Sequence, residues 1–428
     1  MTRAGVLLDE VLPPHASSAA NARALVRAAL ETAAAEEWAD SAQLAVSEVV
    51  TNSLVHAGTS VRLNIRVNAT GLRVEVGDGS PHLPVRRDYS LASGTGRGLH
   101  LVTGLVDDWG SFTHDDGKIV WFEIGPGVEQ TGQGSRDVLN GVGGPSDDTV
   151  AVELRQFPLL MHLAWQEHAS ALLREFLLVN LDEDEVASFE RHAQASDAMN
   201  LLYEQVPAPE LGEDPDAIMS MATEPGVSAP RLVLSVPRAS VPSFATLEAM
   251  LTEAGDLAAS GKLLVPPTQP EVREMRRWLC EQVRVQSVAG AEPEPWVLPE
   301  ISAAREVRFP GPQVDLREFS ESGRAVLATD DGSVVVAVSP SAAALLGYRS
   351  GEDLVGQPIT RIVPHRYHQA HIAGTTLHMV NGRAPLLGVR VRVPVVTADG
   401  SEAVVALVVE PRLLQDGHRM FVAEFFPD

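Results

Sequence analysis

A helical stretch near the N-terminus, residues 45–58, most strongly constrains what this chain can fold into. Its apolar residues recur at helical spacing and define one buried stripe, which consists of Val46, Val49, Val50 and Leu54. Glu48 and Asn52 are four residues apart, so they share a second face that is turned away from the stripe. The pattern fits an ordinary amphipathic helix, but a carboxylate and a carboxamide on one face also suit a hard cation.

The residues after this helix predict strands that end in a polar turn. Residues 61–67 and 72–76 alternate apolar and polar side chains, as the two half-buried strands of a hairpin do. Asp78 follows the second strand between Gly77 and Gly79, and these glycines let a flat ring approach the backbone. The Asp78 carboxylate can accept a hydrogen bond from an exocyclic amine such as that of adenine.

A glycine-rich segment, residues 93–99, opens the next apolar helical run. Glycines at the start of a helix present backbone N–H groups to an anion, and Arg97 adds a guanidinium that suits phosphate. This motif alone is weak, because most glycine-rich loops hold no nucleotide. Residues 112–124 then predict a second hairpin, which turns at Asp116 and Gly117.

The order of these three motifs resembles the GHKL ATP-binding fold, and most closely the bacterial anti-sigma-factor serine kinases (RsbW-like). The resemblance implies that Glu48 is the catalytic base and that Asn52 binds magnesium at the ATP site. It also implies that adenine and the phosphates are held by Asp78, Gly79, Gly94, Gly96, Arg97, Gly98 and Leu99. The turn at Asp78 lacks the second glycine of the usual Asp-x-Gly-x-Gly form.

Length and charge limit the other possibilities. A chain of 428 residues is expected to hold two or three domains, and a formal charge of -24 argues against nucleic acid as a direct partner. The single cysteine, Cys280, excludes an internal disulfide framework. Because no apolar run could span a bilayer and no signal-peptide core follows Met1, we expect a cytoplasmic protein that has no membrane partner.

The middle of the chain gives fewer signals. Residues 125–148 have the composition of a flexible linker, and residues 149–154 suit a strand. Helical patterning follows over 159–205, 244–255 and 270–285, so a mostly helical docking region is expected. A phosphoacceptor role for the histidines of segment 162–168 is disfavoured, because histidine kinases carry the phosphoacceptor before the ATP-binding domain.

The last part of the chain has a different pattern. A hairpin over 326–338 and short helices over 339–378 precede three strands, at 388–396, 402–410 and 418–426. This order resembles a PAS sensor domain and leaves the ligand open. His365, His368 and His371 are spaced three apart, which suits a helix surface or, with a fourth ligand, a metal site. His371 falls where haem-binding PAS domains place their axial histidine, so haem is the alternative to a structural role.

The sequence therefore predicts an α+β multidomain protein. It would contain an N-terminal GHKL α/β sandwich (the Bergerat ATP-binding fold) in 1–127, a linker in 128–148, a mostly helical region in 149–300 and a PAS domain in 314–428. We expect ATP and Mg²⁺ as ligands, and serine/threonine phosphorylation of a protein antagonist in transcription regulation. Expected partners are a sigma factor or an anti-sigma antagonist, and a second copy of the chain in a homodimer. The alternatives are a non-catalytic nucleotide-gated switch and a PAS-driven signalling scaffold.

Overall fold

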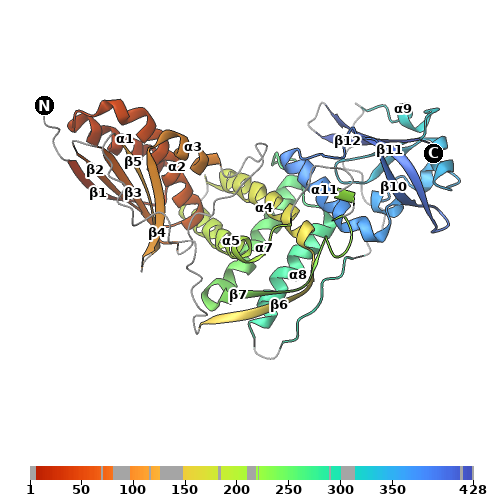
Figure 1. The fold of residues 1–428 in the computed structure, drawn as a ribbon, viewed down its shortest axis with the longest axis horizontal. Coiled ribbons are helices and arrows are strands. Elements are labelled where there is room, and N and C mark those ends of the chain that lie inside the picture. The colour runs from red at the N-terminus through yellow and green to blue at the C-terminus, as the bar shows by residue number, and fades with distance from the viewer. Residues whose placement is uncertain are drawn as a thin grey trace.

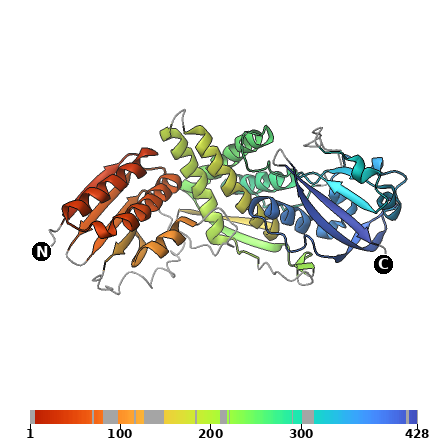
Figure 2. The same ribbon diagram turned by 90° about the horizontal axis from the view of Figure 1, so that it is seen from above.

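The computed structural model describes most of the chain. It describes residues 6–68, 71–80, 97–114, 117–125, 148–181, 185–209, 218–219, 221–288, 291–299, 314–414 and 418–426. The molecule is elongated, and its two termini lie at opposite ends of the long axis (Figure 1). A five-stranded antiparallel sheet lies toward each end, with long helices between the two sheets (Figures 1 and 2).

The N-terminal part is a two-layer α/β arrangement. Its sheet has the order β1-β2-β3-β5-β4 and consists of β1 (Val6–Leu12), β2 (Val61–Val67), β3 (Leu72–Asp78), β4 (Asp108–His114) and β5 (Gly117–Ile124). One face is covered by α1 (Ser17–Thr32), the short η1 (Glu36–Trp38), α2 (Ala39–Ala57) and α3 (Arg97–Leu105), with α1 and α2 side by side (Figure 2).

Periodicity explains this packing. The predicted stripe of α2 is buried, and it meets the inward residues of β2 and β3, which include Leu63, Ile65 and Val74. The sequence analysis did not anticipate β1. Its outward residues Leu7 and Val11 are themselves apolar and largely exposed, so the strand shows no clean alternation of apolar and polar residues.

The middle part is mostly helical, as expected, and carries a two-stranded ribbon. The helices are α4 (Leu159–Asn180), α5 (Glu185–Gln205), α7 (Val241–Ala259) and α8 (Pro270–Gln286). The ribbon pairs β6 (Thr149–Phe157) with β7 (Ala229–Pro237). The sequence predicted the start of β6 but not β7, which is bounded by prolines and pairs with a strand far away in the chain. None of the described helices is long and apolar enough to cross a membrane.

The C-terminal part has the predicted succession of a hairpin, short helices and three strands. Its sheet order is β10-β11-β12-β8-β9, from β8 (Val326–Thr329), β9 (Val335–Val338), β10 (Val391–Val396), β11 (Glu402–Leu413) and β12 (Arg419–Phe426). Between β9 and β10 lie α10 (Pro340–Leu345), η4 (Gly351–Asp353), η5 (Ile359–Ile362), η6 (His365–Tyr367) and α11 (His368–Asn381). The short α9 (Arg317–Ser320) packs on the opposite face of the sheet through Phe319.

The apolar cores extend across the boundaries between these parts. Ile372, Ala373 and Leu377 of α11 belong to the same buried cluster as the helices of the middle part. At the other end, Leu177 of α4 and Phe189 of α5 are buried with the N-terminal core. The helix α4 therefore contributes to both clusters, and the three parts are joined by packed side chains as well as by the backbone.

Gly58, directly after α2, provides a test of one of these junctions. It is left-handed (φ 61°), and a Cβ there would lie 2.6 Å from both the Ala193 Cβ and the Phe189 backbone oxygen of α5. Gly382 ends α11 with a similar φ of 75°, but its Cβ would meet nothing within 4 Å. Both alanine substitutions cost about 1 kcal/mol for the left-handed backbone.

We therefore expect Gly58→Ala to lower the urea midpoint of unfolding clearly more than Gly382→Ala, because the clash with α5 adds about 1–3 kcal/mol. Circular dichroism of the full chain in urea is the measurement. Equal midpoints for the two variants would show that α2 and α5 are not tightly packed in solution.

Candidate functional site

Asp78 occupies a position where the sheet would otherwise place a core residue. Along β3, the residues Leu72, Val74 and Val76 point to the helix-covered face and are buried. The two-residue period of a strand puts Asp78 on the same face. Its side chain is 0% exposed, so the sequence has placed a carboxylate at the inner end of the sheet.

Lys118 is the partner of this buried carboxylate. It lies directly opposite Asp78 in the antiparallel register of β3 and β5, and its Nζ is 3.0 Å from the Asp78 Oδ1. The Lys118 side chain is only 7% exposed. The backbone N–H of Ser80 also donates to Oδ1, at 3.0 Å. The pair keeps two opposite charges together where water cannot solvate them.

The second oxygen of Asp78 is unsatisfied. Oδ2 is buried and has no hydrogen-bond partner among the described residues. Buried carboxylate oxygens normally accept hydrogen bonds, because leaving one unpaired costs free energy. A hydrogen-bond donor on a ligand, such as the exocyclic amine of adenine, would satisfy this oxygen. The site therefore fits an adenine nucleotide.

Glycines hold the backbone around Asp78 in place. A Cβ on Gly117 (φ 146°) would lie 1.9 Å from the Asp78 carbonyl oxygen, so only glycine fits at the start of β5. The N–H of Gly79 donates to the Oγ1 of Thr59 at 2.9 Å. Because Thr59 follows α2, this bond fixes the turn after β3 to the end of α2.

The helix α2 carries the other predicted polar residues. Glu48 and Asn52 are both half-buried, one turn apart and on the side away from the buried stripe, as the sequence analysis expected. The helix packs against both β3 and α3. The arrangement thus places a carboxylate and a carboxamide on the helix that borders the Asp78 turn and the start of α3.

The predicted phosphate-binding lid is described in part. Gly94 and Gly96 lie outside the described residues. Arg97, Gly98 and Leu99 form the first turn of α3, for which the structure describes the backbone. The same helix is anchored on the N-terminal core by the buried Val102. A helix that starts directly after a glycine-rich segment is suited to bind an anion at its N-terminus.

A metal ion at this site would need the nucleotide. Within the described ranges, no group of three or more His, Cys, Asp or Glu residues could hold a metal ion. Mg²⁺ usually takes one or two protein oxygens and completes its shell with phosphates and waters. Asn52, with Glu48 one turn away, fits such an incomplete set.

The sequence analysis did not single out Lys118, although a signal for it was present. Lys118 begins the series Lys118, Val120, Phe122 and Ile124, which alternates with period two, so a buried position was predictable. That it faces Asp78 follows from the register of β3 and β5, which no local pattern contains.

The histidines of the middle part are structural. His162 is 1% exposed and packs between Phe157 and Trp165, with ring centroids 4.9 Å and 5.3 Å away. Burial lowers the pKa of His162 to about 3. His168 is also buried, and its Nε2 lies 2.7 Å from the Pro266 carbonyl oxygen. Neither ring is accessible to a phosphate donor.

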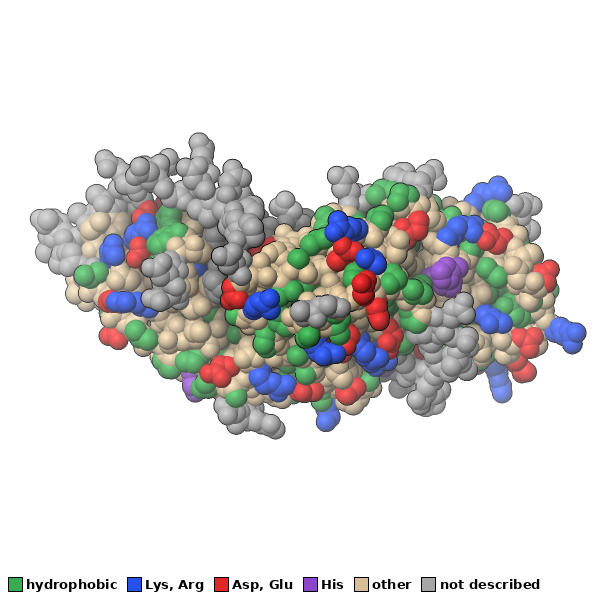
Figure 3. Space-filling view, turned by 90° about the horizontal axis from the view of Figure 1, so that it is seen from below, with side chains coloured by type: hydrophobic (Ala, Val, Ile, Leu, Met, Phe, Trp, Pro, Cys, Tyr) green, Lys and Arg blue, Asp and Glu red, His purple; other side chains and the backbone are tan. Residues whose placement is uncertain are grey.

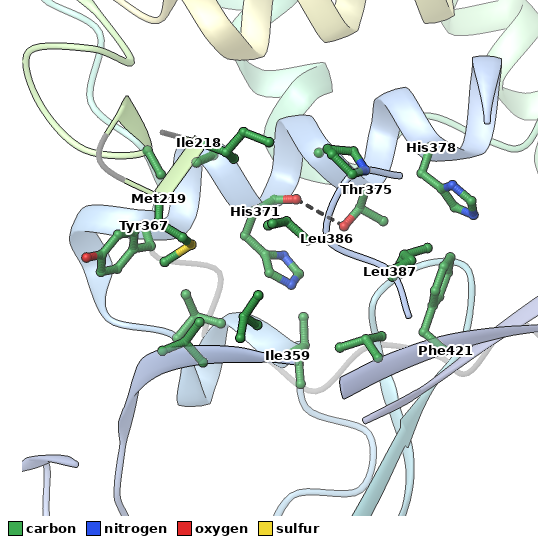
Figure 4. Close-up of a pocket in the computed structure, with 18 of the residues that line it drawn as sticks. Ile218, Met219, Ile359, Tyr367, His371, Thr375, His378, Leu386, Leu387 and Phe421 are labelled. Atoms are coloured by element: carbon green, nitrogen blue, oxygen red, sulfur yellow. Dashed lines mark hydrogen bonds between the residues drawn. The ribbon is translucent and has the colours of Figure 1, made fainter. Parts of the chain in front are cut away.

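The three histidines near α11 do not form a metal site. The rings of His365 and His368 lie 5.1 Å apart, and the Nε2 of His368 is 2.8 Å from the Val363 carbonyl oxygen. His371 instead points into a cavity (Figure 4). His365 belongs to η6, whereas His368 and His371 belong to α11, and no metal-binding group is found among the described residues.

The cavity next to His371 is a second candidate site. It has a volume of about 390 Å³ and lies between α11 and the face of the sheet that carries Leu327 and Phe425. Figure 4 shows His371 and Thr375 of α11 on one side and Phe421 of β12 nearby. Ile218 and Met219, which precede β7, form another part of the wall.

Comparisons with known proteins agree with the N-terminal geometry. Residues 12–124 match the family model of the histidine kinase-like ATPase domain. This match includes Glu48, Asn52, Asp78 and Lys118. The comparison with curated proteins finds no match.

Two solved structures show weaker likenesses. One is the PAS domain of an HTR-like protein from Haloarcula marismortui, with 18% identity over 26% of this chain and 86% of that chain, and a TM-score of 0.20. The other is an RNA-binding light-oxygen-voltage receptor, with 11% identity over 98% of this chain and 95% of that chain, and a TM-score of 0.22. At these scores, neither likeness supports a functional conclusion.

The buried pair can be tested through stability. Lys118→Met keeps the volume of the side chain but leaves the Asp78 carboxylate buried without its cation, so we expect the free energy of unfolding to fall by about 3–5 kcal/mol. Arg62→Met is the control, because the Arg62–Asp9 pair between β1 and β2 is shorter, at 2.6 Å, but exposed. Exposed pairs contribute little.

Urea unfolding of the full chain measures both variants. Similar, small effects of Lys118→Met and Arg62→Met would contradict the buried ion pair. The double variant Lys118→Met/Asp78→Asn removes both buried charges. If it is no less stable than Lys118→Met alone, while Lys118→Met has a large effect, the result would support the buried ion pair.

Proposed function

We propose that the chain is an ATP-binding regulatory protein of the anti-sigma-factor serine/threonine kinase type, with a C-terminal PAS sensor. The observation that carries the proposal is the Asp78 carboxylate, which is buried, bound on one oxygen by Lys118 and without a partner on the other among the described residues. The match of residues 12–124 to histidine kinase-like ATPase domains supports ATP as the ligand. Asp78 would then select the 6-amino group of adenine over a 6-oxo group, because an ionised carboxylate only accepts hydrogen bonds.

Phosphoryl transfer assigns a role to each of the other residues. The serine or threonine hydroxyl oxygen of the protein antagonist attacks the γ-phosphorus of ATP, and the bond between that phosphorus and the bridging oxygen breaks to release ADP. Glu48 accepts the hydroxyl proton, and Asn52 binds the magnesium that neutralises the phosphates. The start of α3, with Arg97, holds the phosphates from the other side.

A protein partner fits the surface better than a polyanion does. The formal charge of the chain is -24. On the face shown in Figure 3, basic and acidic side chains are interspersed over the middle of the molecule and are not separated by sign. Such a surface is compatible with a protein partner. We propose a sigma factor or an anti-sigma antagonist as that partner, and a second copy of the chain in a homodimer.

A non-catalytic nucleotide-gated switch is a second candidate, which a specific contact favours. The helix that carries Glu48 and Asn52 ends at Gly58, directly against the backbone of Phe189 in α5. A nucleotide that moves α2 would therefore change the packing of the middle part without any phosphoryl transfer. Only the kinase requires Glu48 to act as a base.

ATP binding is tested by titration calorimetry of the full chain with magnesium. We expect wild type to bind one ATP and Asp78→Asn to lose most of the affinity, because an amide nitrogen can face the adenine amine and the Lys118 charge is left unpaired. Arg97→Ala should weaken binding less. Asp9→Asn is the control on the exposed strand β1 and should bind as wild type. A folded wild-type protein that gives no heat with ATP and magnesium would overturn the proposal.

The role of Glu48 separates the two candidates. Glu48→Gln keeps the shape of the side chain but cannot take the hydroxyl proton, so transfer of labelled phosphate to a co-purified partner should be abolished. The affinity for ATP should stay within a few-fold of wild type. Glu31→Gln, on the exposed side of α1, should change neither quantity. Transfer at the wild-type rate by Glu48→Gln would remove Glu48 from the mechanism.

A further inference from the structure

The C-terminal cavity is too large to be a packing defect. Protein interiors rarely leave voids larger than a water molecule, whereas sites for small molecules measure about 300–1,000 Å³. The cavity here measures about 390 Å³. Its walls are mostly aliphatic and aromatic. They come from η5, α11, the segment between α11 and β10, and the sheet, for example Ile359, Leu386, Leu387 and Phe421 (Figure 4).

The charges around the cavity exclude most polar ligands. Among the described residues that line it, Arg383 is the one side chain with a full charge, and it makes interactions of its own. No acidic side chain and no lysine is present in that set. A cation would therefore lose its hydration without gaining a counter-charge from these residues, and an anion would meet only Arg383, which already interacts with other groups. Burying either charge is unfavourable.

Two histidines of α11, His371 and His378, line the cavity. The Nδ1 of His378 is buried without a hydrogen-bond partner among the described residues, and its ring packs against Phe421 with centroids 5.4 Å apart. The hydroxyl of Thr375 donates to the backbone oxygen of His371 at 3.0 Å, so its proton is already used. The imidazole of His371 points into the cavity (Figure 4) and has no hydrogen-bond partner among the described residues. Burial, with a smaller contribution from His368, lowers the pKa of His371 to about 4, so the ring is neutral near pH 7. A neutral imidazole offers one donor and one acceptor.

We propose that this cavity binds a neutral, predominantly apolar organic molecule that exchanges one hydrogen bond with His371. The inference rests on the proposed sensor role of the C-terminal part and names the chemical class of its ligand. The occupant would also contact the middle part of the chain, because Ile218, Met219 and Met221 belong to the cavity wall. The ligand thus sits at the junction of two parts whose apolar residues share one core through α11.

A matched pair of probes tests the chemical class. 2-Naphthol and naphthalene-2-sulfonate share a fluorescent ring system and differ in charge. In fluorescence titrations of the full chain at pH 7.5, we expect 2-naphthol to bind at one site, roughly tenfold or more tighter than the sulfonate, because the charge cannot be desolvated in this cavity. Equal affinities, or tighter binding of the sulfonate, would overturn the proposal.

A cavity-filling variant tests the location. A Cβ on Gly374, which lines the cavity in α11, would meet nothing within 4 Å. Gly374→Leu should therefore fill the void and abolish 2-naphthol binding, while the higher helix propensity of leucine favours folding. Gly255→Leu is the control, because its Cβ in α7 is equally unobstructed and Gly255 does not line the cavity. Wild-type binding by Gly374→Leu would show that the probe sits elsewhere.

Two further variants test the contacts. His371→Phe should weaken 2-naphthol about two- to tenfold, the size of one neutral hydrogen bond, and leave 2-methylnaphthalene unaffected or tighter. If His371→Phe weakened the binding of both probes equally, the substitution would act by disturbing the cavity, and the hydrogen bond from His371 to the ligand would be contradicted. Met219→Ala should weaken both probes, because it removes apolar wall from the middle part. No change in Met219→Ala would contradict the contact with the middle part.

ATP titrations of the same samples separate this inference from the proposed function. Gly374→Leu should bind ATP and magnesium as wild type does, which also shows that the variant is folded. Binding of ATP without specific binding of 2-naphthol would refute the cavity ligand alone. Binding of 2-naphthol without ATP would refute the proposed nucleotide site and leave the cavity ligand standing.

Discussion

The candidate nucleotide site depends on one buried ion pair. Asp78 and Lys118 face each other across two central strands, and both side chains are almost fully buried. A buried carboxylate without a cation would destabilise the sheet, and Lys118 supplies the opposite charge for Asp78 inside the core. Lys118 and the Ser80 N–H use one carboxylate oxygen, and the other has no partner among the described residues, so that second oxygen is the one that could recognise a ligand. The pair therefore stabilises the site and also determines which oxygen of Asp78 can accept a hydrogen bond from a ligand.

Two helices, α2 and α4, connect the N-terminal part to the rest of the molecule by packing contacts. The end of α2 lies against α5, and α4 contributes Leu177 to the N-terminal core. The same α4 packs against α11 at its other end, where Ile372 and Leu377 join the middle core. Removing the C-terminal part would expose this apolar surface of the middle part. The C-terminal part and the candidate site at Asp78 are thus connected by packed helices, which is the physical condition for coupling between them.

The helix α11 both packs in the core of the middle part and lines the C-terminal cavity. Ile372 and Ala373 of α11 belong to the core of the middle part, whereas His371 and Thr375 line the cavity. A molecule in the cavity would press on the same helix that closes the middle core. The helical period places these two sets of residues on different sides of α11 within a few turns.

The sequence by itself determined the local elements and the chemistry that each carries. Alternation fixed β2 and β3, the apolar stripe fixed α2 with Glu48 and Asn52 on its free face, and glycines marked the turn at Asp78. Only the tertiary structure decided which of these groups meet. The pairing of Asp78 with Lys118, the strand β7 and the wall that Met219 adds to the cavity all join residues far apart in the chain. Such contacts depend on strand register and helix packing, and no local pattern encodes them.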